Sequence, residues 1–332
     1  MAATSTTETW DAAWTLTMRA KRKRLTDNIS DAYPTVGRFR RSGIMEVENG
    51  GKEIQEDLMY GLGSSEWFDG FDVLSTDSTD GITAAFEQFR YNATPIVISM
   101  TEEREARKSD SAVKLLEAKT KQAMTKSMDT INAAIHGAQS GKSIVGLQDI
   151  CAEGTSTTLH SIAVSSNSWW DNQRTDFNAS YTSFSTQSNN RFQGPLGMGV
   201  VWNNASEAND KTNLIITSMT YYGEYEALFE GTGYTRFVKS GSGRSGPGFG
   251  LGAEGDISFR GAPVIGDRDC VSDSMYLLNT KYLKLKIQGG LNFAKTPFKE
   301  PTNQLAKVAF VVVGVQLMTN NRRRQGLLYD LA

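Results

Sequence analysis

Residues that commonly carry out catalysis are scarce in this chain. Its 332 residues include two histidines, His136 and His160, and two cysteines, Cys151 and Cys270. Two histidines exclude a His-rich metal centre and leave few candidates for a His-based catalytic site. The cysteines lie far apart and outside any C-x-x-C spacing, so the sequence indicates neither a disulfide framework nor a zinc site. We therefore predict two buried, apolar cysteines and no metal site.

Two glycine-rich stretches resemble phosphate-binding loops, and both depart from the motif. Gly137–Ser143 has three residues between its glycines where a P-loop has four, and it follows a predicted helix where a P-loop follows a strand. Gly241–Gly246 fits the dinucleotide fingerprint G-x-G-x-x-G, but Pro247 and Gly248 come next, so no helix can begin there with its dipole aimed at a pyrophosphate. No G-x-S-x-G elbow occurs, and nothing fixes two carboxylates at catalytic separation. The prediction is a structural protein with no catalytic residues and no cofactor; a soluble α/β hydrolase with an unrecognised acid pair is the alternative from another class.

Composition favours a folded, nearly neutral protein. Hydrophobic residues make up 39% of the chain, aromatic residues 10% and charged residues 22%, and the formal net charge is -2. These values argue against disorder, and a general nucleic-acid binder would usually be far more basic. A chain of this length exceeds the size that suits one hydrophobic core, so we expect two lobes that share an intertwined chain. The longest apolar run, Val308–Met318, is too short to span a bilayer, and no membrane partner is expected.

The first 42 residues are predicted to form an N-terminal arm. Residues 1 to about 36 are polar, which is typical of a mobile segment rather than of a core element. Two basic clusters, at residues 19–24 and 38–41, fall within or close to this segment. Their contact candidates are Lys21, Arg22, Arg24, Arg38, Arg40 and Arg41. A solvated charged face is the alternative interpretation of both clusters.

Residues 43–100 are predicted to be extended. Turn signals at Asn49–Gly51 and Asp77–Gly81 separate strand-like stretches. Phe89, Tyr91 and Ala93 alternate with polar residues, which is the period of a strand with one covered face.

A long polar loop with an aromatic cluster lies within this extended region. Trp67, Phe68 and Phe71 stand in a Gly-rich setting between the strand-like stretches. A globular protein rarely keeps so long a polar hairpin unless the hairpin is used, so we predict a projecting loop whose aromatic side chains contact a partner. A β-meander packed on its own core is the alternative.

Residues 101–139 are predicted to hold one long helix, from about Thr101 to His136. Thr101 can cap it, Glu102 and Glu103 suit its first turn, and Gly137 can supply a left-handed stop. Its apolar stripe has helical spacing if Thr120 fills the one polar position. The stripe consists of Val113, Leu116, Met124, Met128, Ile131 and Ile135. A helix this long with one apolar side fits a spine laid across a sheet, and a coiled coil is the alternative.

The remaining residues suggest a second lobe and a return to the first. Residues 140–270 are rich in Ser, Asn, Gly and aromatic residues, with a buried strand expected at Leu214–Thr217 and a helix around Ser218–Phe229. Residues 271–332 are expected to return to the sheet of the first lobe. Within them, the β-branched run Lys307–Met318 suits a central strand.

This order of elements resembles the major capsid proteins of tailed bacteriophages with the Hong Kong 97-like fold. The passage Phe259–Asp269, followed by Met275–Leu285, is similar to the family's "apolar-Pro-Val, Asp, then Tyr-x-Leu-Asn-x-x-Tyr-Leu" passage. The strand and helix of Leu214–Phe229 also look like the axial lobe of the family, and the resemblance covers nearly the whole chain.

The resemblance implies an α+β fold in five parts. They are an N-terminal arm at 1–42, the extended E-loop with adjoining strands at 43–100, a peripheral-domain spine helix at 101–139, an axial α/β domain at 140–270, and a return to the peripheral sheet at 271–332. It also implies a structural protein of the virion that assembles in the host cytoplasm into an icosahedral shell.

The resemblance names partners as well. They are copies of the chain itself in pentamers and hexamers, a portal, decoration proteins, and double-stranded DNA enclosed without sequence-specific binding. A separate scaffolding protein is implied, because the chain reaches its E-loop after about 40 residues and leaves no room for an internal scaffolding segment. An encapsulin-like compartment shares the architecture and is the alternative within the fold.

Overall fold

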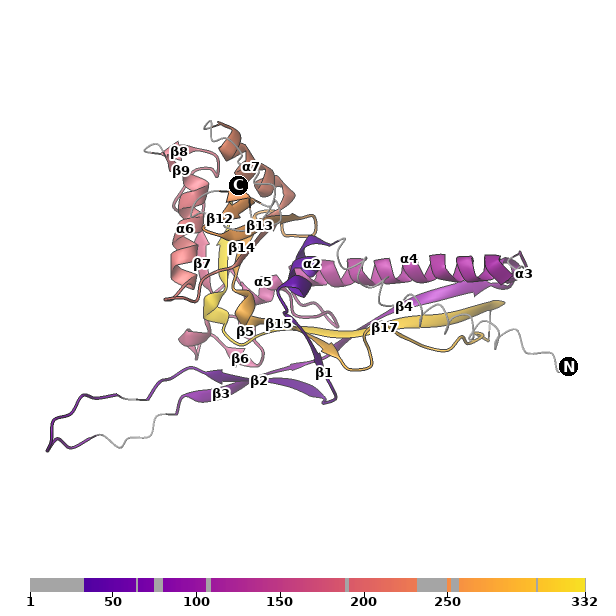
Figure 1. The fold of residues 1–332 in the computed structure, drawn as a ribbon, viewed down its shortest axis with the longest axis horizontal. Coiled ribbons are helices and arrows are strands. Elements are labelled where there is room, and N and C mark those ends of the chain that lie inside the picture. The colour runs from indigo at the N-terminus through magenta and orange to yellow at the C-terminus, as the bar shows by residue number, and fades with distance from the viewer. Residues whose placement is uncertain are drawn as a thin grey trace.

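The computed structural model describes residues 33–63, 65–74, 80–105, 109–188, 191–231, 250–251, 257–302 and 304–331. They form an elongated part made of a long sheet and a long helix, a compact lobe at one end of it, and a projecting ribbon (Figure 1).

The elongated part is built on a five-stranded sheet. Its central strand, β17 (Ala306–Thr319), pairs antiparallel with β4 (Arg90–Ser99), β15 (Leu283–Gln288) and β16 (Ala294–Lys295). β1 (Met45–Glu48) runs parallel to β15. The register between β17 and β4 extends from Ala306 opposite Ser99 to Val315 opposite Arg90. The predicted central strand that returns to the first lobe is therefore confirmed.

The long helix α4 (Ser109–His136) lies along β4 and β17 (Figure 1). The predicted stripe is buried from Leu116 to Ile135. The buried Thr120 hydroxyl donates to the Leu116 carbonyl at 2.6 Å, so the one polar side chain in the stripe has a hydrogen-bond partner. The side chain of Val113 lies outside the described residues.

The ends of the spine helix differ from the prediction. The expected Thr101–His136 helix is divided into α3 (Met100–Glu105) and α4. The left-handed stop expected at Gly137 is wrong, because Gly137 does not have a positive φ; the glycine with a positive φ, 58°, after the helix is Gly141.

The compact lobe contains a seven-stranded sheet and two covering helices, α6 (Gln193–Ala205) and α7 (Met219–Gly231). The strand order is β11 (Gly250–Leu251), β12 (Ile257–Phe259), β13 (Ala262–Asp267), β10 (Leu214–Ser218), β14 (Ser274–Leu278), β18 (Gly326–Tyr329) and β7 (Gln173–Asp176). Leu214 and Ile216 belong to one core cluster and Ile215 to the other, so both faces of β10 are covered, as predicted.

Two expected boundaries need correction. β14 and β18 fall within residues 271–332, which were expected in the peripheral sheet, yet both pair within the axial sheet. Within the expected arm at 1–42, residues Pro34–Arg41 form helix α2, whose Val36 and Phe39 are buried. The basic residues around them hid this apolar face in the sequence.

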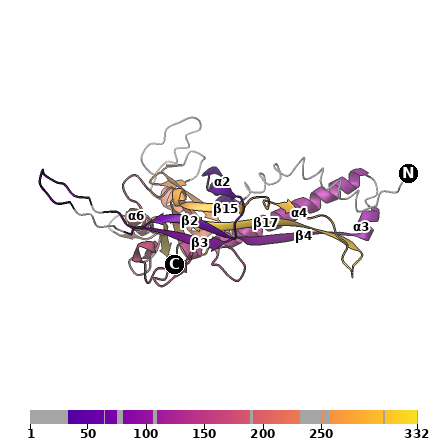
Figure 2. The same cartoon turned by 90° about the horizontal axis from the view of Figure 1, so that it is seen from below.

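The ribbon is an antiparallel pair, β2 (Glu53–Met59) and β3 (Ile82–Gln88), and its loop reaches away from α4 in both views (Figures 1 and 2). Gly50 and Gly51, with φ of 88° and 91°, make the turn that leads from β1 into β2, which confirms the predicted turn there. Shorter elements fill the connection between α4 and α6. They are α5 (Leu147–Ile150), β5 (Thr158–Leu159), β6 (Ile162–Ala163), β8 (Gln187–Ser188) and β9 (Arg191–Phe192).

Candidate assembly surfaces

The loop of the ribbon exposes the three predicted aromatic residues. Trp67 and Phe71 have 103% of their reference surface accessible and Phe68 has 67%. Asp69 and Asp72 form a hydrogen-bonded turn at this point, with the Asp69 amide donating to the Asp72 carboxylate at 2.9 Å. Large aromatic side chains that stay this exposed are candidates for burial by a partner.

The base of the loop is anchored, in contrast to its tip. The Tyr60 ring stacks on Trp169 with centroids 4.8 Å apart. The Tyr60 amide donates to the Gly81 carbonyl at 2.9 Å, which closes the base of the loop. On β3, the Phe86 amide donates to the His160 carbonyl at 3.3 Å. The ribbon is therefore held at its base, while Trp67 and Phe71 near its tip remain fully exposed.

An ionic cluster ties the ribbon to the peripheral sheet. Glu56 points inward from β2 between Ile54 and Leu58, and its carboxylate lies 2.8 Å from Nζ of both Lys284 and Lys286 on β15. Burial alone would raise the pKa of Glu56, but the hydrogen bonds from the two lysines outweigh burial and lower it. Glu46 on β1 adds a further ion pair to Lys286 at 2.8 Å. The cluster thus joins three strands that come from distant parts of the sequence.

The sheet has an apolar face that α4 does not cover. The covered face predicted for Phe89, Tyr91 and Ala93 is only partly confirmed. Phe89, just before β4, is buried, but on β4 itself Tyr91 is 58% exposed and Ala93 is exposed, while Asn92 between them turns toward α4. Asn92 accepts a hydrogen bond from the Ser127 hydroxyl at 2.9 Å. Phe310, opposite Pro95, continues the outer face on β17 and is 41% exposed. This face is a second candidate for burial in an assembly.

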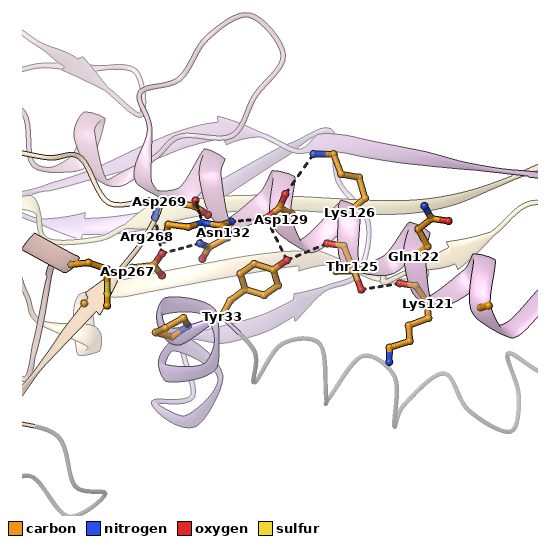
Figure 3. A pocket seen from close by; sticks show the side chains of 14 residues that line it. Tyr33, Lys121, Gln122, Thr125, Lys126, Asp129, Asn132, Asp267, Arg268 and Asp269 are labelled. Atoms are coloured by element: carbon orange, nitrogen blue, oxygen red, sulfur yellow. Dashed lines mark hydrogen bonds and ion pairs between the residues drawn. The ribbon is translucent and has the colours of Figure 1, made fainter.

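A polar junction joins the N-terminal helix, the spine helix and the axial sheet (Figure 3). Asp267, at the end of β13, accepts hydrogen bonds from the Thr35 hydroxyl at 2.7 Å and from the Asn132 amide at 3.2 Å, and lies 3.3 Å from Nε2 of His136. Burial alone would raise the pKa of Asp267, but the hydrogen bonds from His136 and Thr35 hold it well below its usual range. These contacts fix the orientation of α4 relative to the axial lobe.

Both histidines and both cysteines lie in the buried interior of the subunit. His136 belongs to this junction, and His160 is buried, with its Nε2 accepting from the Thr319 amide at 3.3 Å. Cys151 and Cys270 are buried and unpaired, and burial raises the pKa of each thiol to about 12. Within the described ranges, no group of three His, Cys, Asp or Glu side chains could hold a metal ion. In the same residues no helix is long and apolar enough to cross a bilayer.

The basic candidates are not brought together with the aromatic ones. Arg38, Arg40 and Arg41 lie on α2 beside the junction, whereas Trp67, Phe68 and Phe71 lie on the ribbon loop, far from α2 (Figure 1). The candidates Lys21, Arg22 and Arg24, like the linker motif at 241–246, lie outside the described residues.

The ionic cluster of Glu56, Lys284 and Lys286 was not predicted from the sequence. Glu56 shares its strand face with the apolar Ile54 and Leu58, and Lys284 and Lys286 are separated by the single apolar residue Leu285. Both patterns mark charges that face inward, and together they could have indicated a buried ion pair.

Comparison with known proteins identifies the fold. No protein-family model and no curated protein matches the chain. One chain in the solved structure of the cyanophage A-1(L) capsid asymmetric unit is 15% identical to this protein. The match covers 86% of this chain and 90% of that chain, with a TM-score of 0.61. A satellite phage P4 procapsid that includes the size determination (Sid) protein is 12% identical over 94% and 92%, with a TM-score of 0.53. The holo-SrpI encapsulin complex from Synechococcus elongatus PCC 7942 is 8% identical over 88% and 86%, with a TM-score of 0.52.

These likenesses span almost the whole of each chain. The protein therefore has the Hong Kong 97-like capsid fold, and the predicted fold class is confirmed.

Proposed function

We propose that this chain is the major capsid protein of a tailed bacteriophage, a structural subunit that assembles into the icosahedral shell around the genome. The observation that carries the proposal is the likeness to the cyanophage capsid subunit over 86% of this chain and 90% of that one. Fold alone does not decide function, but the exposed apolar surfaces of the subunit also favour assembly.

The distribution of apolar surface supports assembly. The aromatic loop and the outer face of the sheet lie at different ends of one elongated subunit (Figures 1 and 2). Two unlike surfaces of this kind suit head-to-tail contacts, which close into rings when the rotation between copies allows it. Pentamers and hexamers of this chain, with the E-loop of one copy reaching over the next, would bury both surfaces.

The other partners follow from the same proposal. They are a separate scaffolding protein, a portal and decoration proteins, with assembly in the host cytoplasm and the finished shell as part of the virion. Double-stranded DNA would be enclosed without sequence-specific binding. The formal net charge of -2 is compatible with weak electrostatic binding of the DNA phosphates.

Electron microscopy of the purified chain tests the proposal most directly. Shells or ring-shaped capsomers are expected, whereas a compact monomer at all concentrations would support the soluble α/β hydrolase. An encapsulin-like compartment is the second candidate, because the SrpI encapsulin shares the fold with a TM-score of 0.52. Nucleic acid inside shells isolated from their source favours the phage capsid, and protein cargo favours the compartment.

A further inference from the structure

An open groove of about 1170 Å³ runs along the solvent side of the spine helix next to the Asp267 junction (Figure 3). Ala118, Gln122 and Thr125 form its wall on α4, and Met219, at the start of α7, lines its far side with 57% of its surface exposed. Carbon atoms, including the stems of the neighbouring lysines, supply most of its lining. A groove of this kind favours an apolar occupant over a charged one.

The described chain begins inside this groove. Tyr33 is one of its lining residues, and its hydroxyl donates to the Thr125 carbonyl at 3.3 Å and to the Asp129 carboxylate at 3.5 Å. Pro34 follows it as the first residue of α2. The 32 preceding residues must therefore leave from the wall of the groove.

The preceding segment carries an apolar stripe that suits the groove. Trp14, Met18, Leu25 and Ile29 are spaced by 4, 7 and 4 residues, so a helix would place all four on one side. From Met18 to Ile29 is eleven residues, as is from Ala118 to Asp129, so the two helical lengths match at about 16 Å each.

We propose that residues 1–32 dock in this groove of their own subunit through the stripe Trp14, Met18, Leu25 and Ile29. Docking in the same chain is favoured because Tyr33 lies in the groove, so residue 32 of the same chain is already beside it. The basic cluster at 19–24 is then held beside the spine helix at a defined place. This inference concerns the single subunit and does not depend on shell formation.

Hydrogen exchange of the full-length, unassembled chain provides the first test. Amides in residues 10–30 should be protected, and Trp14→Asp with Met18→Asp should lower that protection by about tenfold or more. The matched control is Thr9→Asp with Ala20→Asp, which adds the same charge on the opposite side of the helix and should leave protection unchanged. Fast exchange of residues 10–30 in the unsubstituted chain would overturn the proposal.

Crosslinking then decides between the same subunit and a neighbour. Met18→Cys and Gln122→Cys in one chain should be joined within that chain by a bis-maleimide, since the native Cys151 and Cys270 are buried. A mixture of the two single variants should give no crosslinked dimer. Crosslinks that form only in the mixture would place the segment on a neighbouring subunit and overturn the proposal.

Discussion

Removing the aromatic side chains of the loop should separate folding from assembly. In the variant Trp67→Ala with Phe68→Ala, the subunit loses side chains that are 103% and 67% exposed, so its stability should change by no more than about 0.5 kcal/mol. If a neighbouring copy buries both rings, each truncation should cost about 2 kcal/mol at that contact. Together they amount to about 4 kcal/mol, or roughly a thousandfold in the equilibrium constant of one contact.

Two measurements on the same preparation test this prediction. Thermal unfolding of the unassembled subunit reports its stability, and sedimentation with electron microscopy reports shells and capsomers. Ser65→Ala with Glu66→Ala is the matched control, because it shortens two exposed side chains of the same loop without removing an aromatic ring. A lower unfolding temperature without a separate assembly defect would refute the reasoning, as would normal shells from the aromatic variant.

Four further predictions concern the interior, the two polar clusters and the arm. Ile131→Asp should put an unpaired carboxylate under the sheet, cost about 3 kcal/mol or more and leave the protein insoluble, whereas the exposed neighbour change Thr130→Asp should not; normal shells from the first would mean that the stripe faces solvent. Glu56→Gln should speed hydrogen exchange in the ribbon at neutral pH. Because the pKa of Glu56 is lowered on folding, the unsubstituted ribbon should keep its protection at neutral pH and lose it only below the pH range in which a glutamate carboxyl ordinarily titrates. Asp267→Asn should lower the free energy of unfolding at pH 7 by about 3 kcal/mol in a denaturant titration. The difference from the unsubstituted protein should be smaller at acidic pH, because the pKa of Asp267 is lowered on folding and the stability that its ionised carboxylate contributes is lost on protonation. An equal difference at both pH values would contradict this. Reversing the charges at Lys21, Arg22 and Arg24 should impair the assembly of empty shells without DNA, as should added salt with the unsubstituted chain; unchanged empty shells with lost DNA retention would instead make the arm a nucleic-acid contact.

Local patterns predicted the elements with a strong period. The spine helix could be predicted because Leu116, Met128 and Ile135 recur at helical spacing. Strand β17 could be predicted because a β-branched run of this kind is typical of a strand covered on both faces. The division into α3 and α4 gave no such signal, since Glu102 and Glu103 suit the first turn of α3 as well as that of the single long helix that was expected.

Tertiary context overrode the pattern on β4. Phe89, Tyr91 and Ala93 were predicted to form the covered face of a strand, and Phe89 is buried. On β4, however, Asn92 turns toward α4, where its side chain accepts a hydrogen bond from Ser127, and Tyr91 and Ala93 face outward. An arrangement with a polar residue inside and an apolar residue outside is unfavourable for an isolated domain. It becomes favourable when another molecule covers the outer, apolar face. The error of the sequence prediction at β4 therefore falls on a candidate assembly surface.

The attachment of the ribbon to the peripheral sheet also suits a loop whose exposed residues contact another subunit. A two-stranded ribbon has too little core to be stable alone, so its position depends on its base. That base combines the packing of Ile54 and Leu58 with the ion pairs from Glu56 to Lys284 and Lys286, and the lysines lie on β15 of the peripheral sheet. An ion pair requires defined geometry where apolar packing tolerates sliding, so the cluster sets the direction in which the loop leaves the subunit. Trp67 and Phe71 at the tip are uncovered in the subunit, as expected if a partner buries them on assembly.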